Sequence, residues 1–167
     1  MKNDLEIFQV GNPVLRETAL WVEFVDDELR EILSDMERAM FANDGAGLAA
    51  PQVGLNKRMF VARIGADVVK MINPELSDFS DEKITMEEGC LSVLGTKGPV
   101  FADVVRPESV RVKWTDENGH QHNEIFEGIP SRIIQHEYDH LDGVLFIDKI
   151  SGLRRMMILS KVKKAQK

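Results

Sequence analysis

One stretch, between Pro130 and Gly143, constrains the fold of this chain most, because its pattern His136-Glu137-x-x-His140 makes chemical sense only on a helix. Residues four apart lie on one face of a helix, so the two imidazoles can bind the same metal ion. Glu137 follows the first histidine, where its carboxylate can reach a metal-bound water without being a ligand. Proline in a first turn and glycine just past a last turn are helix-boundary signals. We therefore predict a metal-binding helix here, rather than two chance histidines on a solvated helix.

Two further helices are predicted, one towards each end of the chain. The acidic residues Asp26, Asp27 and Glu28 favour a helix start, because they complement the positive end of the helix dipole. Apolar residues then recur at helical spacing until Asn43, which indicates one buried face. Ser151 can cap a last helix that also carries apolar side chains.

Segments rich in β-branched residues predict two antiparallel hairpins, each with a turn signal at its tip. The pairs are residues 58–64 with 68–72 and residues 109–114 with 120–127. Asn73-Pro74 is expected to break the first hairpin's strand pattern, and residues 76–82 to form a polar loop. Together these elements predict one α+β domain over residues 1–167. Mainly antiparallel strands pack around the central metal-binding helix, with an N-terminal and a C-terminal helix.

Residues 45–54 are expected to form a loop of small residues. This loop lacks the Lys-Ser/Thr of a phosphate-binding loop and the spacing of a dinucleotide fingerprint. We expect its glycines instead to let the backbone approach a ligand closely. Gln52 is the only long polar side chain in it, and two roles fit equally well. It either bonds to nearby backbone or donates a hydrogen bond into a cleft.

Composition restricts the compartment and the partners. The net charge of −7 argues against a generic binder of DNA or of anionic membranes, but it combines +6 on residues 151–167 with −13 on residues 1–150. The first five residues have no signal-peptide hydrophobic core, and no apolar run reaches membrane-spanning length. Cys90 is the sole cysteine, so it cannot form an intrachain disulfide. We therefore expect a cytoplasmic protein with no membrane partner.

A catalytic metal with two histidines usually needs a third protein ligand and an open position for water. No histidine follows His140 and no glutamate follows Glu137, so the common zinc-protease patterns lack their third ligand. The acidic residues that remain downstream are Asp139, Asp142 and Asp148. Upstream, His120 and His122 fit a solvated hairpin face better than a metal site. Cys90 fits either a thiolate ligand or a small buried hydrophobe, and the residues alone leave this choice open.

Three stretches, in order along the chain, resemble the signatures of the peptide deformylase family. Residues 45–52 read Gly-Ala-Gly-Leu-Ala-Ala-Pro-Gln, residues 88–92 read Glu-Gly-Cys-Leu-Ser, and residues 135–143 read Gln-His-Glu-Tyr-Asp-His-Leu-Asp-Gly. A lone His-Glu-x-x-His is a modest signal, but three ordered motifs are highly specific. The resemblance spans nearly the whole chain, including Pro13 to Arg16, Ile72 to Pro74 and Arg106-Pro107.

The resemblance implies that Cys90, His136 and His140 bind one divalent metal ion, with water in the fourth position. In this family the ion is ferrous iron in most cases, and zinc, nickel or cobalt can substitute. It also implies that Glu137 is the general base and acid for attack of a metal-bound hydroxide on the formyl group of an N-terminal formylmethionine. Gln52 and the backbone N–H of Leu91 would stabilise the oxyanion.

The same resemblance implies the substrate and the partners. Gly45, Gly47 and Gly89 would lie along the substrate backbone, and Ile133 would form part of the methionine pocket. The substrates would be nascent formylated polypeptides. The basic C-terminal segment fits either weak contact with the ribosome or a solvated helix face. The alternatives are a zinc metallopeptidase of another family and a non-catalytic protein with a structural metal.

The chain departs from the family's pattern at two places. Leu94 stands where the family commonly has proline, and residues 95–105 form a longer segment than is usual before Arg106-Pro107. In relatives this segment edges the cleft, so the departures bear on substrate reach and leave the metal ligands unaffected.

Overall fold

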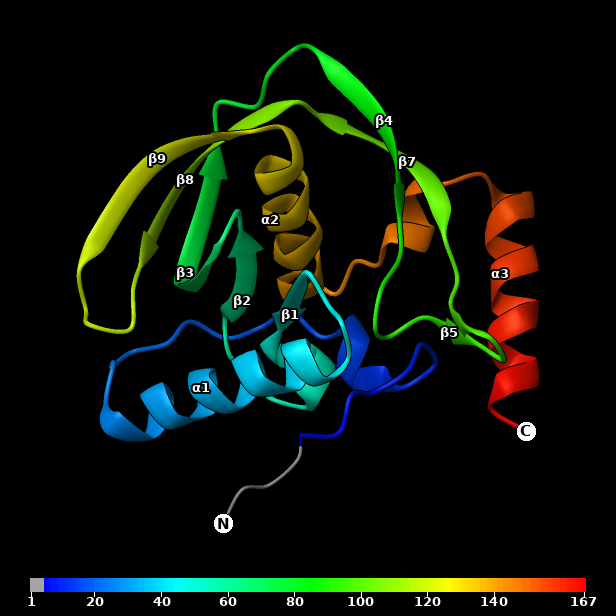
Figure 1. The fold of residues 1–167 in the computed structure, drawn as a ribbon, viewed down its shortest axis with the longest axis horizontal. Helices are drawn as coiled ribbons and strands as arrows, with labels where there is room; N and C mark the ends of the chain where they lie inside the picture. Colours follow the sequence, from blue (N-terminus) through cyan, green and yellow to red (C-terminus); the bar gives the residue numbers. More distant parts are fainter. Residues whose placement is uncertain (1–4) are drawn as a thin grey trace.

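Helix α2 (Gly128–Leu141) runs through the middle of the molecule, and strands surround it (Figure 1). The structure is a computed structural model that describes residues 5–167. Apolar Ile134 and Leu141 of α2 are buried, and so are several polar residues of the same helix, among them Ser131 and Gln135. A helix with buried polar side chains on one face is a functional element as well as a packing element. The predicted α+β fold with a buried central helix is confirmed.

The main sheet has five antiparallel strands in the order β1-β2-β3-β8-β9. They are β1 (Gly47–Ala49), β2 (Met59–Ile64), β3 (Asp67–Ser77), β8 (Ser109–Thr115) and β9 (Gln121–Glu127). Both predicted hairpins are confirmed, since β2 pairs with β3 and β8 with β9 at the expected turns.

Two smaller pairs of strands lie outside this sheet. Strands β4 (Lys83–Glu88) and β7 (Ala102–Pro107) form a two-stranded ribbon that arches over α2 (Figure 1). Strands β5 (Leu94–Gly95) and β6 (Gly98–Pro99) form a short hairpin between them. No strand was predicted for either half of the ribbon. Three 3-10 helices complete the described part of the chain: η1 (Pro13–Arg16), η2 (Ala50–Val53) and η3 (Phe146–Lys149).

The predicted terminal helices are α1 (Asp27–Ala42) and α3 (Gly152–Ala165). The Asp26 carboxylate accepts a hydrogen bond from the Leu29 N–H at 2.9 Å and caps α1. Ser151 caps α3 in the same way. None of the helices in the part of the chain that the structure describes is long and apolar enough to cross a membrane. The expectation that the chain starts without a signal peptide concerns residues 1–4, which lie outside the described residues.

Three apolar clusters form the core. The first lies between α1 and strands β1 and β2, and the second lies under α3 and η3. The third fills the space between the main sheet and α2. Burial of α2 between the sheet and the ribbon fixes the direction in which its polar side chains point.

Two sequence predictions were wrong, both because long-range pairing overrode local signals. Strand β3 does not stop at Asn73-Pro74 but continues to Ser77 through a register shift between Ile72 and Glu75. Asn73 has a φ of +50°, and its side chain forms hydrogen bonds with the backbone of Val22. Pro74 has no backbone N–H to donate, and a strand tolerates such a residue at a bulge. Residues 47–53 are not a loop, because β1 pairs with β2 and then leads into η2.

Candidate active site

The site is built on α2, which presents His136 and His140 one turn apart with Glu137 beside them. The two imidazole rings lie 5.2 Å apart between centroids, at 70° to each other. Pro130 lies in the first turn of the helix as predicted. Gly143 follows the helix with a φ of +70°, and a Cβ there would lie 2.5 Å from the carbonyl oxygen of Arg16. The helix therefore ends where it does because only glycine fits that position.

Cys90 joins the two histidines from the loop that follows β4. The ligand atoms of Cys90, His136 and His140 all lie within 4.8 Å of one another. Cys90 Sγ and His140 Nε2 lie 3.3 Å apart. One sulfur and two imidazole nitrogens form a borderline-soft set that suits iron, cobalt, nickel or zinc. The residues present therefore fit a divalent transition metal.

Glu88, the last residue of β4, orients His136. Its Oε1 lies 2.8 Å from His136 Nδ1. Burial raises the pKa of Glu88, but hydrogen bonds from His136 and Arg106 outweigh this and lower it to about 2. An ionised carboxylate can only accept, so Nδ1 carries a proton and Nε2 is the ring nitrogen through which His136 would bind a metal. Carboxylate support of this kind is typical of metal-binding histidines.

Two arginines hold the Glu88 carboxylate in turn. Arg106 donates to both of its oxygens at 2.7 and 3.0 Å, and Arg132 donates to Oε2 at 2.6 Å. Arg132 also donates to the carbonyl oxygens of Val104 and Ile84, on β7 and β4. This network ties the ribbon to α2 and leaves no acceptor of Glu88 without a donor.

The electrostatics of the site separate Glu137 from Glu88. Burial raises the pKa of Glu137 to about 7, close to the value that suits a general base at neutral pH. Burial also lowers the pKa of His140 well below its ordinary value, which keeps that ring neutral and able to bind a metal. Among the described residues, Glu137 Oε2 and His140 Nδ1 are buried without a hydrogen-bond partner. A buried carboxylate oxygen with no partner is suited to exchange a proton with a small molecule in the site.

A cavity of about 580 Å³ opens onto these groups. Every substrate and oxyanion residue proposed from the sequence lines it: Gly45, Gly47, Gln52, Gly89, Leu91 and Ile133. Cys90, His136 and Glu137 also line it, whereas His140 is not among its lining residues. A Cβ on Gly47 would lie 2.4 Å from Glu137 Oε1, so the strand β1 backbone passes directly against the proposed base.

Gln52 is buried and fixed at both ends of its amide. Its Oε1 accepts from the Ala49 N–H at 2.9 Å, and its Nε2 donates to Ser92 Oγ at 3.0 Å and lies 3.5 Å from Cys90 Sγ. The backbone-bonding role that the sequence left open is therefore present, and Gln52 also lines the cavity.

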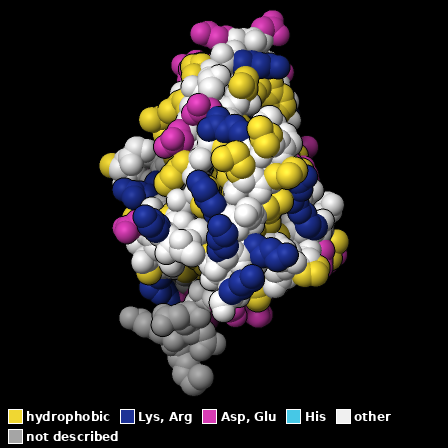
Figure 2. All heavy atoms as spheres, turned by 90° about the vertical axis from the view of Figure 1, so that its right-hand side faces the viewer, with side chains coloured by type: hydrophobic (Ala, Val, Ile, Leu, Met, Phe, Trp, Pro, Cys, Tyr) yellow, Lys and Arg dark blue, Asp and Glu magenta, His cyan; other side chains and the backbone are white. Residues whose placement is uncertain are grey.

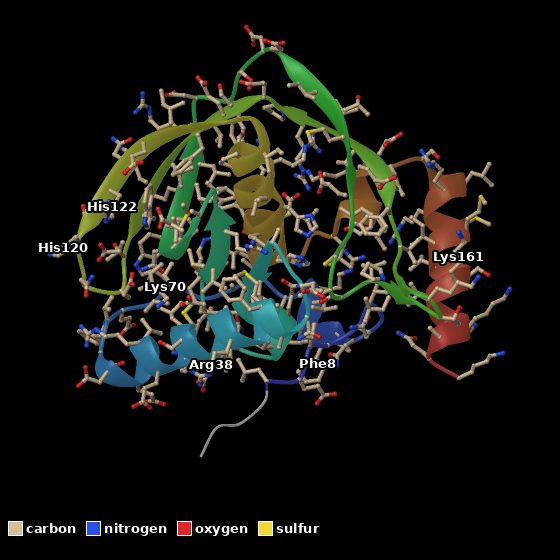
Figure 3. All side chains as sticks on the ribbon, viewed as in Figure 1. Phe8, Arg38, Lys70, His120, His122 and Lys161 are labelled. Carbon is tan, nitrogen blue, oxygen red and sulfur yellow. The ribbon has the colours of Figure 1, made fainter. Side chains whose placement is uncertain are left out.

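The other metal-ligand candidates lie elsewhere. His120 and His122 lie at the tip of the β8–β9 hairpin, away from α2 (Figure 3), and neither lines the cavity. His122 stacks on Trp114 and bonds to Asp116 at 2.7 Å. Each downstream aspartate pairs with an arginine: Asp139 with Arg106, Asp142 with Arg58 and Asp148 with Arg16. Glu88, Arg106 and Arg132 have site contacts that sequence reasoning missed, although Glu88 and Arg106 belong to stretches that carry the family resemblance.

The chain is similar to known proteins over nearly its whole length. A sequence model described as polypeptide deformylase matches residues 4–156. A peptide deformylase of Maricaulis maris is 45% identical over 167 residues, covering 97% of this chain and 94% of that protein. The solved peptide deformylase from Ehrlichia chaffeensis in complex with actinonin has a TM-score of 0.92 and 37% identity, covering 98% of each chain. The one from Thermotoga maritima has a TM-score of 0.85 and 40% identity, covering 89% of this chain and 99% of that one.

Proposed function

The chain belongs to the polypeptide deformylase family, and on that premise we propose that Cys90, His136 and His140 hold its metal ion while Glu137 transfers the protons. The reaction is the metal-dependent hydrolysis of the formyl group from the N-terminal formylmethionine of newly synthesised polypeptides. What supports the residue assignment most is one observation. The ligand atoms of Cys90 and the two histidines lie within 4.8 Å of one another, and Cys90, His136 and Glu137 line the cavity.

The donor set suggests which ion is held. One thiolate and two neutral imidazoles suit borderline divalent metals, and we propose Fe²⁺, with Zn²⁺, Ni²⁺ or Co²⁺ able to replace it. When bound, the ion would supply Lewis acidity, which polarises the formyl carbonyl and lowers the pKa of water in the site.

Glu137 carries the proton through the reaction. As water attacks the formyl carbon, Glu137 takes a proton from it, and a pKa of about 7 suits this transfer near neutral pH. Glu137 then returns that proton to the methionine nitrogen as the carbon–nitrogen bond breaks. The products are formate and a peptide with a free amino terminus.

Gln52 and the backbone N–H of Leu91 stabilise the negative charge that forms on the formyl oxygen. The Gln52 amide cannot rotate freely, because Ala49 fixes its oxygen and Ser92 accepts from its nitrogen. A donor held in place before the reaction needs no reorganisation, and losing one such donor typically costs about 10²–10³ in rate.

The substrate backbone lies between two free strand edges. Strand β1 is the edge strand of the main sheet, and β4 pairs on one side only within the ribbon. An extended peptide can add to such edges through main-chain hydrogen bonds. Gly45 and Gly47 border the cavity on the β1 side and Gly89 on the β4 side, and Ile133 contributes to the pocket for the methionine side chain.

The test is an anaerobic assay of formate release from formyl-Met peptides by the metal-loaded protein. Wild type should release formate, and Glu137→Ala should lose most of this activity while it keeps its metal. No release by the metal-loaded wild type would overturn the proposal. A zinc metallopeptidase of another family would instead cleave internal peptide bonds and keep its metal after Cys90→Ala. The pairing of all three downstream aspartates with arginines does not favour that alternative.

Helix α3 suggests a weak contact with the ribosome, which also fits a cytoplasmic protein that acts on nascent chains. The face that includes α3 carries many lysine and arginine side chains with apolar ones between them (Figure 2). Residues 151–167 contain six basic residues and no acidic one. Contacts of such a segment with RNA phosphates weaken steeply with salt. If deletion of residues 160–167 leaves salt-dependent co-sedimentation with ribosomes unchanged, this part of the proposal is wrong.

A further inference from the structure

The residues that lead into β7 turn a phenylalanine towards the cavity. Along an extended chain, side chains alternate between two faces. Val100 packs against the cluster under α3 and Ala102 is only 2% exposed, so both point inwards. Phe101, between them, is 54% exposed and lines the cavity together with Pro99. This segment belongs to residues 95–105, which the sequence predicts to be longer than is usual in the family.

The position of Phe101 is fixed by a hydrogen bond of its neighbour Val100 and by contact of its own ring with Gly89. The Val100 N–H donates to the Val93 carbonyl oxygen at 3.2 Å, which ties the segment to the loop after Cys90. A Cβ on Gly89 would lie 2.5 Å from Phe101 Cε1, so the ring lies directly over the Gly89 backbone. Exposed aromatic rings that are held in place at the mouth of a cavity offer apolar area at little entropic cost.

The path of a substrate leads past this ring. The formyl group must reach the depth of the cavity, near Cys90 and Glu137, and the methionine side chain takes the apolar part near Ile133. The residues after methionine then leave along the Gly89 edge, where Phe101 is exposed. On the basis of the proposed function, we infer that Phe101 is a specificity-determining residue. It favours apolar and aromatic side chains among the first residues after the formylmethionine.

The test compares Phe101→Ala and Phe101→Leu with Val105→Ala as the matched control. Val105 lies on the same strand face, is 55% exposed and does not line the cavity. The substrates are formyl-Met-amide, which has nothing beyond methionine, formyl-Met-Ala-Ala-amide, and two peptides with phenylalanine in place of either alanine. Formate release is measured with protein of known metal content, and the values of kcat and KM are separated.

We expect Phe101→Ala to raise KM about threefold to tenfold for at least one phenylalanine peptide, the range expected for loss of an aromatic contact. Its kcat, and both constants for formyl-Met-amide, should stay within twofold of wild type. Phe101→Leu should be intermediate, since it keeps apolar area, and Val105→Ala should match wild type with all four substrates.

Two results would overturn the inference. An equal loss of kcat/KM with all four substrates would mean that Phe101 only supports the Gly89 loop, and no change with any substrate would mean that peptides do not pass it. If Phe101→Ala does not fold, the comparison of Phe101→Leu with wild type decides in the same way. Failure of the proposed function is distinguishable, because wild type would then release no formate even from formyl-Met-amide.

Discussion

Gly47→Ala tests the arrangement of the site most directly, because the new methyl group would meet the proposed base. An ideal Cβ at Gly47 lies 2.4 Å from Oε1, 2.7 Å from Cδ and 2.8 Å from Cγ of Glu137. Ordinary contacts between such atoms are about 3.5 Å, so the side chain must move by roughly 1 Å. A turn of the carboxylate tip is not enough, because Cγ is also too close. Glu137 is 4% exposed, so its side chain can move only towards the cavity that it lines, away from its position in the site.

The expected loss follows from that displacement. A shift of about 1 Å in a catalytic group typically costs about 10²-fold in rate. Overpacking in a filled site costs about 1–3 kcal/mol of unfolding free energy. Replacing glycine also restricts the unfolded chain, which returns about 0.4–1 kcal/mol. We therefore expect kcat to fall about 100-fold while the protein stays folded and the three metal-ligand side chains stay intact.

The assay is formate release from formyl-Met-amide at measured metal occupancy, with unfolding followed in denaturant. Gly152→Ala is the matched control, because nothing lies within 4 Å of a Cβ at Gly152, the first residue of α3. It should match wild type. If Gly47→Ala keeps kcat within twofold of wild type at full metal occupancy, then the position of Glu137 against β1 does not matter for the reaction, and the reasoning is refuted.

Three further predictions address the metal, the ribbon and the response to acid. Loss of a residue that only supports a metal ligand typically weakens metal binding about 10–100-fold, and Cys90→Ala should weaken it by more than that. The affinity is measured by competition with a chelator, and an unchanged affinity would exclude Cys90 as a ligand. Arg132→Gln should lower the free energy of unfolding by about 3 kcal/mol, because it removes one partner of the buried Glu88 carboxylate. It should also speed hydrogen exchange in β4 and β7 more than in β8 and β9, because Arg132 bonds to the backbone of β7 and β4. Equal acceleration in all four strands would contradict the proposed tie between the ribbon and α2. Burial raises the pKa of Asp148, but the Arg16 guanidinium and the Leu145 N–H outweigh this and hold it below its ordinary value of 3.8. The stability that Asp148 contributes, about 1 kcal/mol, is therefore fully present above that pH and is lost as the pH falls through the lowered pKa. The difference in unfolding free energy between wild type and Asp148→Asn should accordingly shrink towards zero in acid, and a difference that grows below pH 3.8 would show the opposite linkage.

Local sequence signals predicted the helices that begin or end at a capping residue and the hairpins whose turns contain glycine. Asp26 caps α1 as expected, and Gly143 follows α2 in the left-handed conformation. The turns of both hairpins are also where the sequence placed them, because glycine-containing turns depend on only a few neighbouring residues.

Non-local pairing explains what the sequence did not reveal. Strand β4 is short and mostly polar, and it becomes a strand by pairing with β7, so that Lys83 faces Pro107. Arg132 bonds to groups that lie 28 to 48 residues away along the chain. No periodicity within a helix reports such partners, since they depend on the distance between elements in space.

The sequence by itself determined the chemistry that α2 can carry. Helix geometry places His136, Glu137 and His140 next to one another wherever the helix lies, because that spacing is intrinsic to the backbone. Only the tertiary structure decided which further residues join them. Cys90 lies 50 residues before His140, and it reaches the site because the ribbon is folded back onto α2, whereas His120 and His122 are carried away at a hairpin tip. The position of Phe101 over Gly89 was decided in the same way, since it depends on the packing of residues 95–105 against α3 and not on any local pattern.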